Sequence, residues 1–524
     1  MRVQKKLSTG WIIALIGIPI FIGALDLTVV SAVLPHVIYD LELPIQTQLD
    51  KAAWIVTGYL MAYSIAMSVM GHLSDLYGRR KVFLIALVIF TLGSFMVAIS
   101  DTWLTSAGLR IHYLFSRERM DVPTFSLYII IASRVIQALG GGAMVPVGMA
   151  LIGDIYPVGK RSWALGIIAA IDTAGWVVGH LYGGIVVYYF NWHLIFWLNI
   201  PICVLAFLLI WRALRGIPQE TNIHKIDWVG VALISAVLTF LIVGIGGGGS
   251  ADVSISANSQ DKSVIWWALV ASAACLVLTI LWEQRTRFPI YDPALFKIRN
   301  LLTGGAANLF IGCGMFIAIA NVPIYINSVG TGTLERGAWD SGWLLSALTI
   351  PIALAAIPGG WLTQKFGYKV PALAGIAVAG AGFLWMNHWR VDTAYSAMIP
   401  QLIITGIGFG LTFSPIASAA LDSAPPLQRG TASAIVLTLR LIGMTVGVSS
   451  MTIYDINRAN SIIRKLIAAN ASVGDMVRIS QETLVKVIDE TFLIAAVLCA
   501  LTFVIILFIS NRTLEIGGGK HERQ

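Results

Sequence analysis

The sequence predicts an all-α polytopic membrane protein with two six-helix bundles in pseudo-twofold parallel repeat and two extra linker helices. Composition, the number of apolar segments and an internal repeat lead to this prediction. Charged residues make up 12 % of the 524 residues and hydrophobic residues 57 %, whereas soluble domains carry roughly 25 % charged residues. Such a chain cannot cover a water-facing surface, which excludes soluble domains, disordered chains and disulfide-stapled scaffolds.

Fourteen apolar segments are long enough to cross a bilayer, since a spanning helix needs about 20 residues. We expect 14 spans, at residues 12–34, 54–70, 82–99, 127–152, 164–189, 194–214, 228–246, 264–282, 301–326, 343–362, 370–389, 397–421, 431–453 and 491–509.

The positions of the cations predict the orientation of the chain, because short loops rich in Lys and Arg remain cytoplasmic. With both termini inside, 21 of the 35 cations lie in cytoplasmic segments or at the cytoplasmic end of a span, 12 lie outside and two lie well within spans. The sequence therefore predicts a multi-pass protein of the cytoplasmic membrane with both termini in the cytoplasm. The net charge of +8 is then an orientation signal and does not indicate nucleic-acid binding.

An internal repeat relates the two ends of the chain. An offset of 268 residues relates identical residues in the two parts of the chain: Gly140 to Gly408, Gly142 to Gly410, Asp154 to Asp422, Arg161 to Arg429, Gly175 to Gly443 and Gly179 to Gly447. Nearer the N-terminus the offset is 289 residues, and it relates Gly71 to Gly360 and Gly78 to Gly367. The difference, 289 − 268 = 21 residues, requires an insertion in the first half, and residues 101–126 are the polar stretch available for it.

The repeat predicts three parts. Residues 1–215 form an N-terminal six-helix bundle with the external insertion 101–126, residues 216–299 form two additional helices with cytoplasmic linkers, and residues 300–524 form a C-terminal six-helix bundle. The additional helices contain no buried charge, which favours a packing or spacer role. The external segment 455–490 is amphipathic, and one-face spacing predicts a helix on the membrane surface at Ile462, Ile463, Leu466 and Ile467.

Four charged residues lie well within predicted spans, away from the span ends: Asp26, Arg134, Asp172 and Arg440. Each would cost about 2.5–3.5 kcal/mol at a helix centre if it were unpaired, so we expect them to face one another or a watery cavity. Because 172 + 268 = 440, a carboxylate and a guanidinium occupy equivalent places in the two halves. We hypothesise that Asp26 or Asp172 binds and releases a proton while an arginine modulates its affinity. The alternative is a set of fixed ion pairs between helices.

A tight basic turn follows the second predicted span. Its glycines permit a close turn, and Asp75 can accept hydrogen bonds from a helix N-terminus or pair with an arginine. We expect a conformational latch here, and the alternative is an ordinary loop with orienting charges. The sequence resembles the major facilitator superfamily, whose signature G-x-L-[SA]-D-x-x-G-R-[RK] is matched by Gly71, Leu73, Ser74, Asp75, Gly78, Arg79 and Arg80.

Three further blocks resemble the fourteen-helix drug:proton antiporter branch of that superfamily. Its first-helix motif is matched by Leu25, Asp26, Thr28, Val29, Leu34 and Pro35. Its fourth-helix motif is matched by Arg134, Gln137 and Gly140 to Gly142, and its sixth-helix motif by Trp192, Phe196, Asn199 and Pro201. The combination of Asp26, Asp172 and Arg440 resembles a lipid-exporting subgroup of the branch.

The fifth-helix antiporter motif G-x-x-x-G-P-x-x-G-G is present as Gly175, Gly179, His180, Gly183 and Gly184, with His180 in place of the proline. Glycines at four-residue spacing allow helices to approach closely. His180 either titrates near neutral pH or is a hydrogen-bonded packing residue.

The resemblance implies a secondary active transporter that works by alternating access. We expect proton-coupled efflux of hydrophobic or amphipathic compounds of the multidrug type. The alternative is a lipid exporter or flippase for acylglycerols or glycolipids, and a non-transporting membrane receptor is a third class. The sequence offers no metal-ligand cluster, nucleotide loop or nucleophile–base pair, so we expect neither an enzyme nor a metal or cofactor. The expected partners of a monomeric protein are the substrate, protons and membrane lipids, without nucleic acid.

Overall fold

The computed structural model describes residues 9–42, 51–52, 54–115, 121–215, 226–246, 262–329, 334–467 and 476–511. These residues form α-helices and two short 3-10 helices, and no strand occurs among them. The long helices are α1 (Thr9–Asp40), α3 (Trp54–Tyr77), α4 (Arg79–Ala98), α6 (Val122–Ile155), α7 (Val158–Tyr189), α8 (His193–Ala213), α9 (Trp228–Gly246), α10 (Lys262–Glu283), α11 (Arg299–Val329), α12 (Leu334–Phe366), α13 (Lys369–Met386), α14 (Tyr395–Ser423), α15 (Arg429–Ile467) and α16 (Met476–Ile506).

Each predicted span coincides with one of these long helices. In the described residues, twelve helices are long and apolar enough to cross a membrane. The other two are α7 and α9, and the apolar stretch of α9 is shorter, at Trp228–Gly244. The fold is therefore that of an all-helical polytopic membrane protein, as the sequence predicts.

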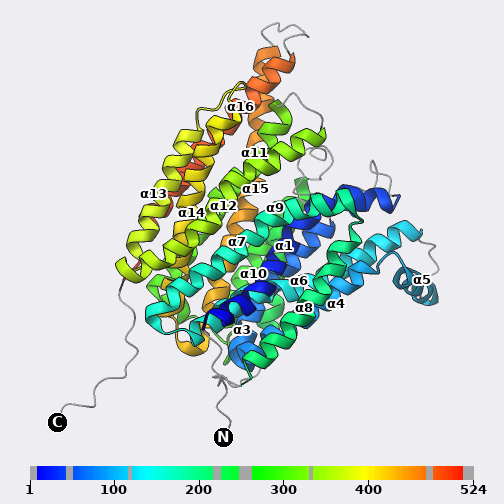
Figure 1. Ribbon diagram of the computed structural model, residues 1–524, viewed down its shortest axis with the longest axis vertical. Coiled ribbons are helices and arrows are strands. Elements are labelled where there is room, and N and C mark those ends of the chain that lie inside the picture. Colours follow the sequence, from blue (N-terminus) through cyan, green and yellow to red (C-terminus); the bar gives the residue numbers. More distant parts are fainter. Residues whose placement is uncertain are drawn as a thin grey trace, which may run out of the picture.

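The helices before α9 pack in one group and those after α10 in another (Figure 1). Equivalent glycine contacts relate the groups. Gly140 of α6 lies against the backbone of Phe90 in α4, and Gly408 of α14 lies against the backbone of Ala379 in α13. Because 408 − 140 = 268 and 379 − 90 = 289, the two offsets of the sequence repeat recur as one helix contact made twice. A Cβ atom at either glycine would collide with the partner backbone, so glycine is needed for this close approach.

The two groups, called the halves below, meet mainly through α7 with α12 and α14, and through α15 with α3 and α6. Hydrogen bonds across this interface include Ser433 Oγ to Pro146 O and Ser414 Oγ to Ser162 O, at 2.9 and 2.7 Å. These contacts lie towards the end of the molecule that holds the turn between α3 and α4. We call it the latch end and the opposite one the far end. The halves are therefore joined at the latch end.

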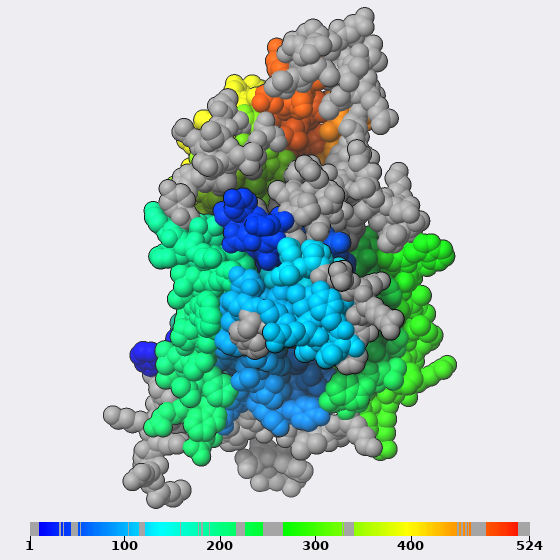
Figure 2. Space-filling view, turned by 90° about the vertical axis from the view of Figure 1, so that its right-hand side faces the viewer, coloured from blue at the N-terminus to red at the C-terminus, as the bar shows by residue number. Residues whose placement is uncertain are grey.

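The additional helices α9 and α10 pack against each other, and α9 also contacts α3 of the first half and α15 of the second. α10 forms an outer flank of the molecule, drawn in green at the right of Figure 2. Its Trp266, Trp267 and Val270 are exposed, as expected for side chains that face lipid.

The far end carries two structures outside the bundles. The insertion 101–126 contains the short helix α5 (Trp103–Phe115), which is held to α6 by a 3.1 Å hydrogen bond between Thr105 Oγ1 and Ser126 Oγ. Residues 116–120 of the insertion lie outside the described residues.

The helix predicted on the membrane surface near Ile462 is an extension of α15 and not a separate helix. α15 continues without a break to Ile467 and projects from the far end beside the start of α16 (Figure 1). No Gly or Pro interrupts residues 448–467, and Arg458 Nε and Nη2 each lie 2.7 Å from a carboxylate oxygen of Glu490 in α16. This two-bond pair holds the extended helices together. Residues 468–475, and the side chains of residues 463–467, lie outside the described part.

Candidate functional site

The four intramembrane charges form two ion pairs. The first, called the intra-half pair, joins Asp26 of α1 to Arg134 of α6, and both belong to the first half. Arg134 Nη1 lies 2.5 Å from Asp26 Oδ2, and Arg134 Nη2 donates to the Asp26 carbonyl at 3.2 Å. The relative exposure of the two residues is 0 % and 1 %. The guanidinium stacks over the Tyr59 ring at 3.9 Å from its centroid.

Polar side chains from α4, α6 and α8 enclose this pair. Gln137 Nε2 and Asn199 Nδ2 donate to Asp26 Oδ1 at 3.0 and 3.4 Å, and both also donate to Ser94 Oγ at 3.2 Å. Gln137 Oε1 accepts from Arg134 Nη1 at 2.6 Å. The carboxylate thus has hydrogen-bond partners on both oxygens, as a buried charge requires. The sequence predicted that the four charges face one another or a watery cavity, but neither this pairing nor the polar enclosure, although Gln137 and Asn199 belong to the fourth- and sixth-helix motifs.

The second pair, called the inter-half pair, joins Asp172 of α7 to Arg440 of α15, in different halves. Arg440 Nη2 lies 3.2 Å from Asp172 Oδ2, and the guanidinium lies 4.7 Å from the Phe413 ring centroid. The relative exposure is 3 % for Asp172 and 8 % for Arg440. The repeat arithmetic that placed these residues at equivalent positions therefore corresponds to a direct contact across the interface.

A small cavity adjoins the inter-half pair. Its volume is about 10 Å³, and its lining comes from both halves: Met149 and Ala169 from the first, and Asn308, Phe413, Ser433 and Arg440 from the second. A cavity of this size is at the lower limit for one water molecule. Arg440 thus borders a space between the halves, whereas Arg134 does not line it.

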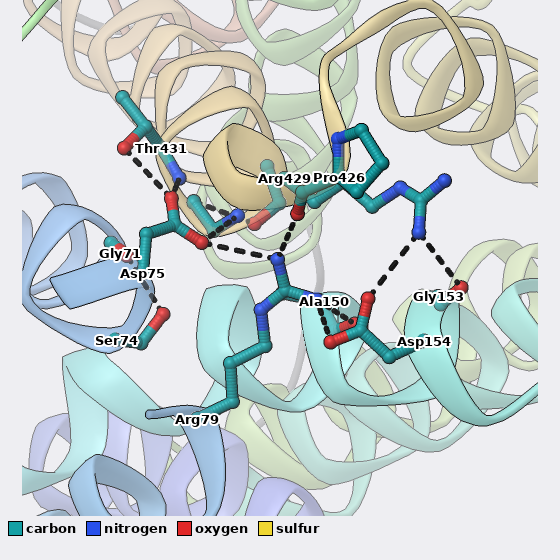
Figure 3. A network of polar contacts seen from close by, with 12 residues as sticks. Gly71, Ser74, Asp75, Arg79, Ala150, Gly153, Asp154, Pro426, Arg429 and Thr431 are labelled. Atoms are coloured by element: carbon teal, nitrogen blue, oxygen red, sulfur yellow. Dashed lines mark hydrogen bonds and ion pairs between the residues drawn. The ribbon is translucent and has the colours of Figure 1, made fainter. Parts of the chain in front are cut away.

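The latch residue Asp75 binds the first turn of α15. Its Oδ1 accepts from Gly430 N at 2.9 Å, and its Oδ2 accepts from Thr431 N and Thr431 Oγ1 at 2.8 and 2.9 Å (Figure 3). A carboxylate at a helix N-terminus is favoured by the free N–H groups and by the helix dipole. The side chain predicted to accept from a neighbouring helix N-terminus does so, and that helix belongs to the other half.

Arg79 connects three elements at the latch. Its Nη2 donates to Asp75 Oδ1 at 3.1 Å and to the Pro426 carbonyl at 2.6 Å, and its Nη1 forms an ion pair with Asp154 of α6 (Figure 3). Asp154 in turn lies 3.3 Å from Arg429 Nη1 at the start of α15. Pairing across the halves therefore extends from α3 through α6 to α15.

A second cluster repeats this arrangement with the halves exchanged. Arg161, at the start of α7, forms an ion pair with Asp422 at the end of α14, and Tyr368 Oη donates to Asp422 at 2.8 Å. Because 161 + 268 = 429 and 154 + 268 = 422, Arg161–Asp422 is the pseudo-twofold counterpart of Arg429–Asp154. Tyr368 corresponds to Arg79, since 79 + 289 = 368. The sequence paired these positions in the repeat without predicting that each Asp binds the Arg of the other half.

Two positions of the latch require glycine, one because of its backbone conformation and the other because a side chain would not fit. Gly78 has φ 93° and its counterpart Gly367 has φ 76°, in the left-handed region that favours glycine. A Cβ at Gly71 would collide with the Gly430 carbonyl and with Ala434 of α15. Arg80 Nη2 donates to the Trp211 carbonyl at 2.9 Å within the first half.

The fifth-helix glycine motif packs α7 onto α1. A Cβ at Gly175 would meet Phe21 and Ala24, and a Cβ at Gly179 would meet Thr28 and Leu25. Gly183 is buried, and Gly184 has open space around it. His180 lies in α7, but its side chain is outside the described part. The motif thus joins the helix that carries Asp26 to the helix that carries Asp172.

Metal binding finds no support in the described residues, where no group of three or more His, Cys, Asp and Glu side chains is placed to hold an ion.

Comparison with known proteins assigns this architecture to a family. A family model described as Major Facilitator Superfamily matches residues 16–448. A probable triacylglyceride transporter of Mycobacterium leprae is 28 % identical, covering 95 % of both chains. A triacylglyceride transporter of Mycobacterium tuberculosis is 29 % identical, covering 95 % of this chain and 93 % of its own. One from Mycobacteroides abscessus is 30 % identical, covering 84 % and 81 %.

Solved structures with the same fold include the human organic anion transporter MFSD10, with a TM-score of 0.59, 12 % identity and coverage of 95 % of this chain and 100 % of that chain. The proton:xylose symporter XylE has a TM-score of 0.57 and 13 % identity, with coverage of 93 % and 94 %. At this identity the likeness concerns the fold alone.

Proposed function

This chain belongs to the Major Facilitator Superfamily, and we propose that within this family it exports an acylglycerol lipid by alternating access. Membership makes the chain a multi-pass membrane transporter and not an enzyme. In this proposal the chain consists of two bundles, residues 1–215 and 300–524, which rock against each other. Residues 216–299 contain the two helices between them.

The observation that carries the lipid proposal is the similarity to mycobacterial triacylglyceride transporters over nearly the full length of the chain. The names of these relatives support lipid export better than multidrug efflux. Efflux of amphipathic drugs is the second candidate, and the first-, fourth- and sixth-helix motifs of the drug:proton antiporters support it.

The proposed cycle centres on the inter-half pair and the latch. The latch is closed in this conformation, because Asp75 of the first half binds Gly430 and Thr431 of the second. We propose that the latch end is cytoplasmic and the far end external, which agrees with the positions of the cations. Opening the latch then separates Asp75 from Gly430 and Thr431, and separating the halves near the membrane centre breaks the pair of Asp172 and Arg440.

Proton coupling is part of this proposal. Breaking the inter-half pair leaves a carboxylate and a guanidinium without partners in the membrane, at about 2.5–3.5 kcal/mol for each charge. Protonation of Asp172 removes one of these charges, so a proton bound there lowers the free energy of the separated state. Asp26 is the alternative proton carrier, and its hydrogen bonds to Gln137, Asn199 and Arg134 all lie within the first half.

The test is transport by the purified protein in liposomes with and without a pH gradient. One substrate is an acylglycerol carrying an NBD fluorophore, which external dithionite reduces only in the outer leaflet, and the other is a cationic dye. We expect protein-dependent movement of the acylglycerol, accelerated by the pH gradient. Asp172→Asn is the coupling variant, and Asp392→Asn, an exposed aspartate at the far end, is its matched control.

The outcomes separate the candidates. Movement of the dye without the acylglycerol would favour multidrug efflux. Acylglycerol movement that is independent of the pH gradient would support a lipid transporter without proton coupling. If the protein moves neither compound above the rate of protein-free liposomes, the export proposal is contradicted.

A further inference from the structure

The segment after α10 joins the additional helices to both halves at the latch end. This segment, residues 284–298, is called the strap and ends at the start of α11. It includes the 3-10 helix η1 (Leu295–Lys297). The Tyr291 hydroxyl hydrogen-bonds to Ser68 Oγ of α3, in the first half. The next residue, Asp292, accepts from Gln428 Nε2 at 3.1 Å, in the second half. Two consecutive residues of the strap therefore bind different halves.

Each of these contacts is held in place by its surroundings. Tyr291 N donates to Glu283 Oε2 at 3.3 Å, and Asp292 Oδ1 accepts from Ala294 N at 2.9 Å. Ile290 is 1 % exposed and packs with Ile234 and Leu238 of α9, with Ile65 of α3 and Ile442 of α15 beside them. These hydrogen bonds and the packing of Ile290 fix the position of the strap.

The strap forms one unit with α9 and α10. Trp282 Nε1 at the end of α10 donates to Asp227 Oδ2 at 2.7 Å, and Asp227 Oδ1 accepts from Gly230 N at 3.0 Å in the first turn of α9. The two helices and the strap are therefore tied together at the latch end.

The strap lies next to the latch. Gln428 belongs to the 3-10 helix η2 (Pro426–Gln428), which ends just before Gly430, a donor to Asp75. A cavity of about 250 Å³ separates strap and latch, and its lining includes Asp75 and His72 from α3, Arg287 and Asp292 from the strap, and Gln428 and Thr431 from the second half.

From this geometry we infer that α9, α10 and the strap form a clasp that stabilises the latch-closed conformation. Opening the latch moves Ser68 away from Gln428, and the adjacent residues Tyr291 and Asp292 cannot follow both. At least one hydrogen bond of the strap must break, so the strap adds to the free energy of opening. The extra helices of this chain, for which the sequence favours a packing or spacer role, then also act as a conformational element. The inference rests on the proposed rocking of the halves, but not on the identity of the substrate.

The test measures latch opening without substrate. Spin labels are attached at Lys81→Cys and Lys365→Cys, two exposed latch-end positions in different halves, after the four native cysteines have been replaced by alanine. Double electron–electron resonance in lipid nanodiscs gives the ratio of open to closed latch. We expect Tyr291→Phe and Ser68→Ala each to raise this ratio about fivefold, since a lost hydrogen bond corresponds to about 1 kcal/mol. Because they remove the same bond, the double variant should equal either single variant.

The matched control is Tyr39→Phe, the same change at an exposed tyrosine of α1, which should leave the ratio unchanged. Asp75→Asn serves as a positive control that opens the latch directly. If Asp75→Asn shifts the ratio but neither Tyr291→Phe nor Ser68→Ala does, the clasp is overturned while the rocking motion stands. If no variant shifts it, the rocking motion fails and the clasp fails with it. Should Tyr291→Phe not fold, Ser68→Ala decides the question alone.

Discussion

The intra-half and inter-half pairs have the same chemistry in different surroundings. Asp26 and Arg134 lie within one half, where Arg134 Nη1 is 2.5 Å from Asp26 Oδ2. Gln137, Asn199 and Ser94 complete the hydrogen-bond network around them. Asp172 and Arg440 lie in different halves, with Arg440 Nη2 3.2 Å from Asp172 Oδ2, and Arg440 borders a cavity.

This difference assigns the two pairs different roles. In the proposed cycle a pair within one half keeps its geometry when the halves move, so Asp26 and Arg134 stabilise the first half in both conformations. A pair between the halves separates in this cycle when the interface opens, so Asp172 and Arg440 contribute to the proposed equilibrium between conformations. The sequence identifies Asp172 and Arg440 as equivalent positions of the repeat, but only the packing of the helices shows that one pair lies within a half and the other between the halves.

The largest effect is expected for removal of Asp26. Asp26→Ala leaves Arg134 buried without a counter-charge, and breaking a buried pair in this way typically costs 3–5 kcal/mol. We expect the free energy of unfolding in detergent to fall by about that amount, and Asp172→Ala to lower it by less than half as much. Equal losses in unfolding experiments on the two variants would remove the distinction between the pairs.

A smaller effect is expected at the contact between α1 and α7, which connects the two pairs. In Gly179→Ala the new Cβ meets the backbone of Leu25 and the Thr28 hydroxyl, and forced overpacking typically costs about 1–3 kcal/mol. Gly184→Ala is the matched control, because nothing lies within 4 Å of its Cβ, and a helical Ala is about 1 kcal/mol better than Gly. Thermal unfolding of both variants checks this, and a stable Gly179→Ala would contradict the close packing.

The smallest effect in free energy is expected for the conservative change Arg440→Lys. The ammonium keeps the charge but lacks the planar guanidinium that stacks on Phe413. We expect the rate of acylglycerol transport to fall about threefold, and the free energy of unfolding to remain unchanged. A loss as large as that of Arg440→Gln would mean that the guanidinium shape, and not its charge, is needed at the inter-half pair.

The spans, the repeat and the four intramembrane charges could be predicted because each rests on a pattern along the chain: apolar length, matching offsets, or a charge that lipid does not tolerate alone. The enclosure of Asp26 by Ser94 and Asn199 could not, since it depends on how α4 and α8 turn towards α1. The exchanged pairs Arg161–Asp422 and Arg429–Asp154 also depend on contact between the halves.

The extension of α15 was missed because an amphipathic segment fits both a membrane surface and a neighbouring helix. Only the partner, Glu490 of α16, decides between the two. The strap was missed for a related reason: Tyr291 and Asp292 stand in a loop without periodicity, and their partners lie in opposite halves of the chain.

The central claim is that the inter-half pair breaks and reforms during lipid export. The direct measurement compares the rate of NBD-acylglycerol movement in liposomes for the unchanged protein, Asp172→Asn, Arg440→Gln and the charge exchange Asp172→Arg with Arg440→Asp. Each single neutralisation should lower the pH-driven rate at least tenfold while the protein remains folded. The charge-exchanged double variant should regain part of the pH-driven rate, because the two positions are equivalent in the repeat. Single variants that transport at the unchanged rate would contradict the claim.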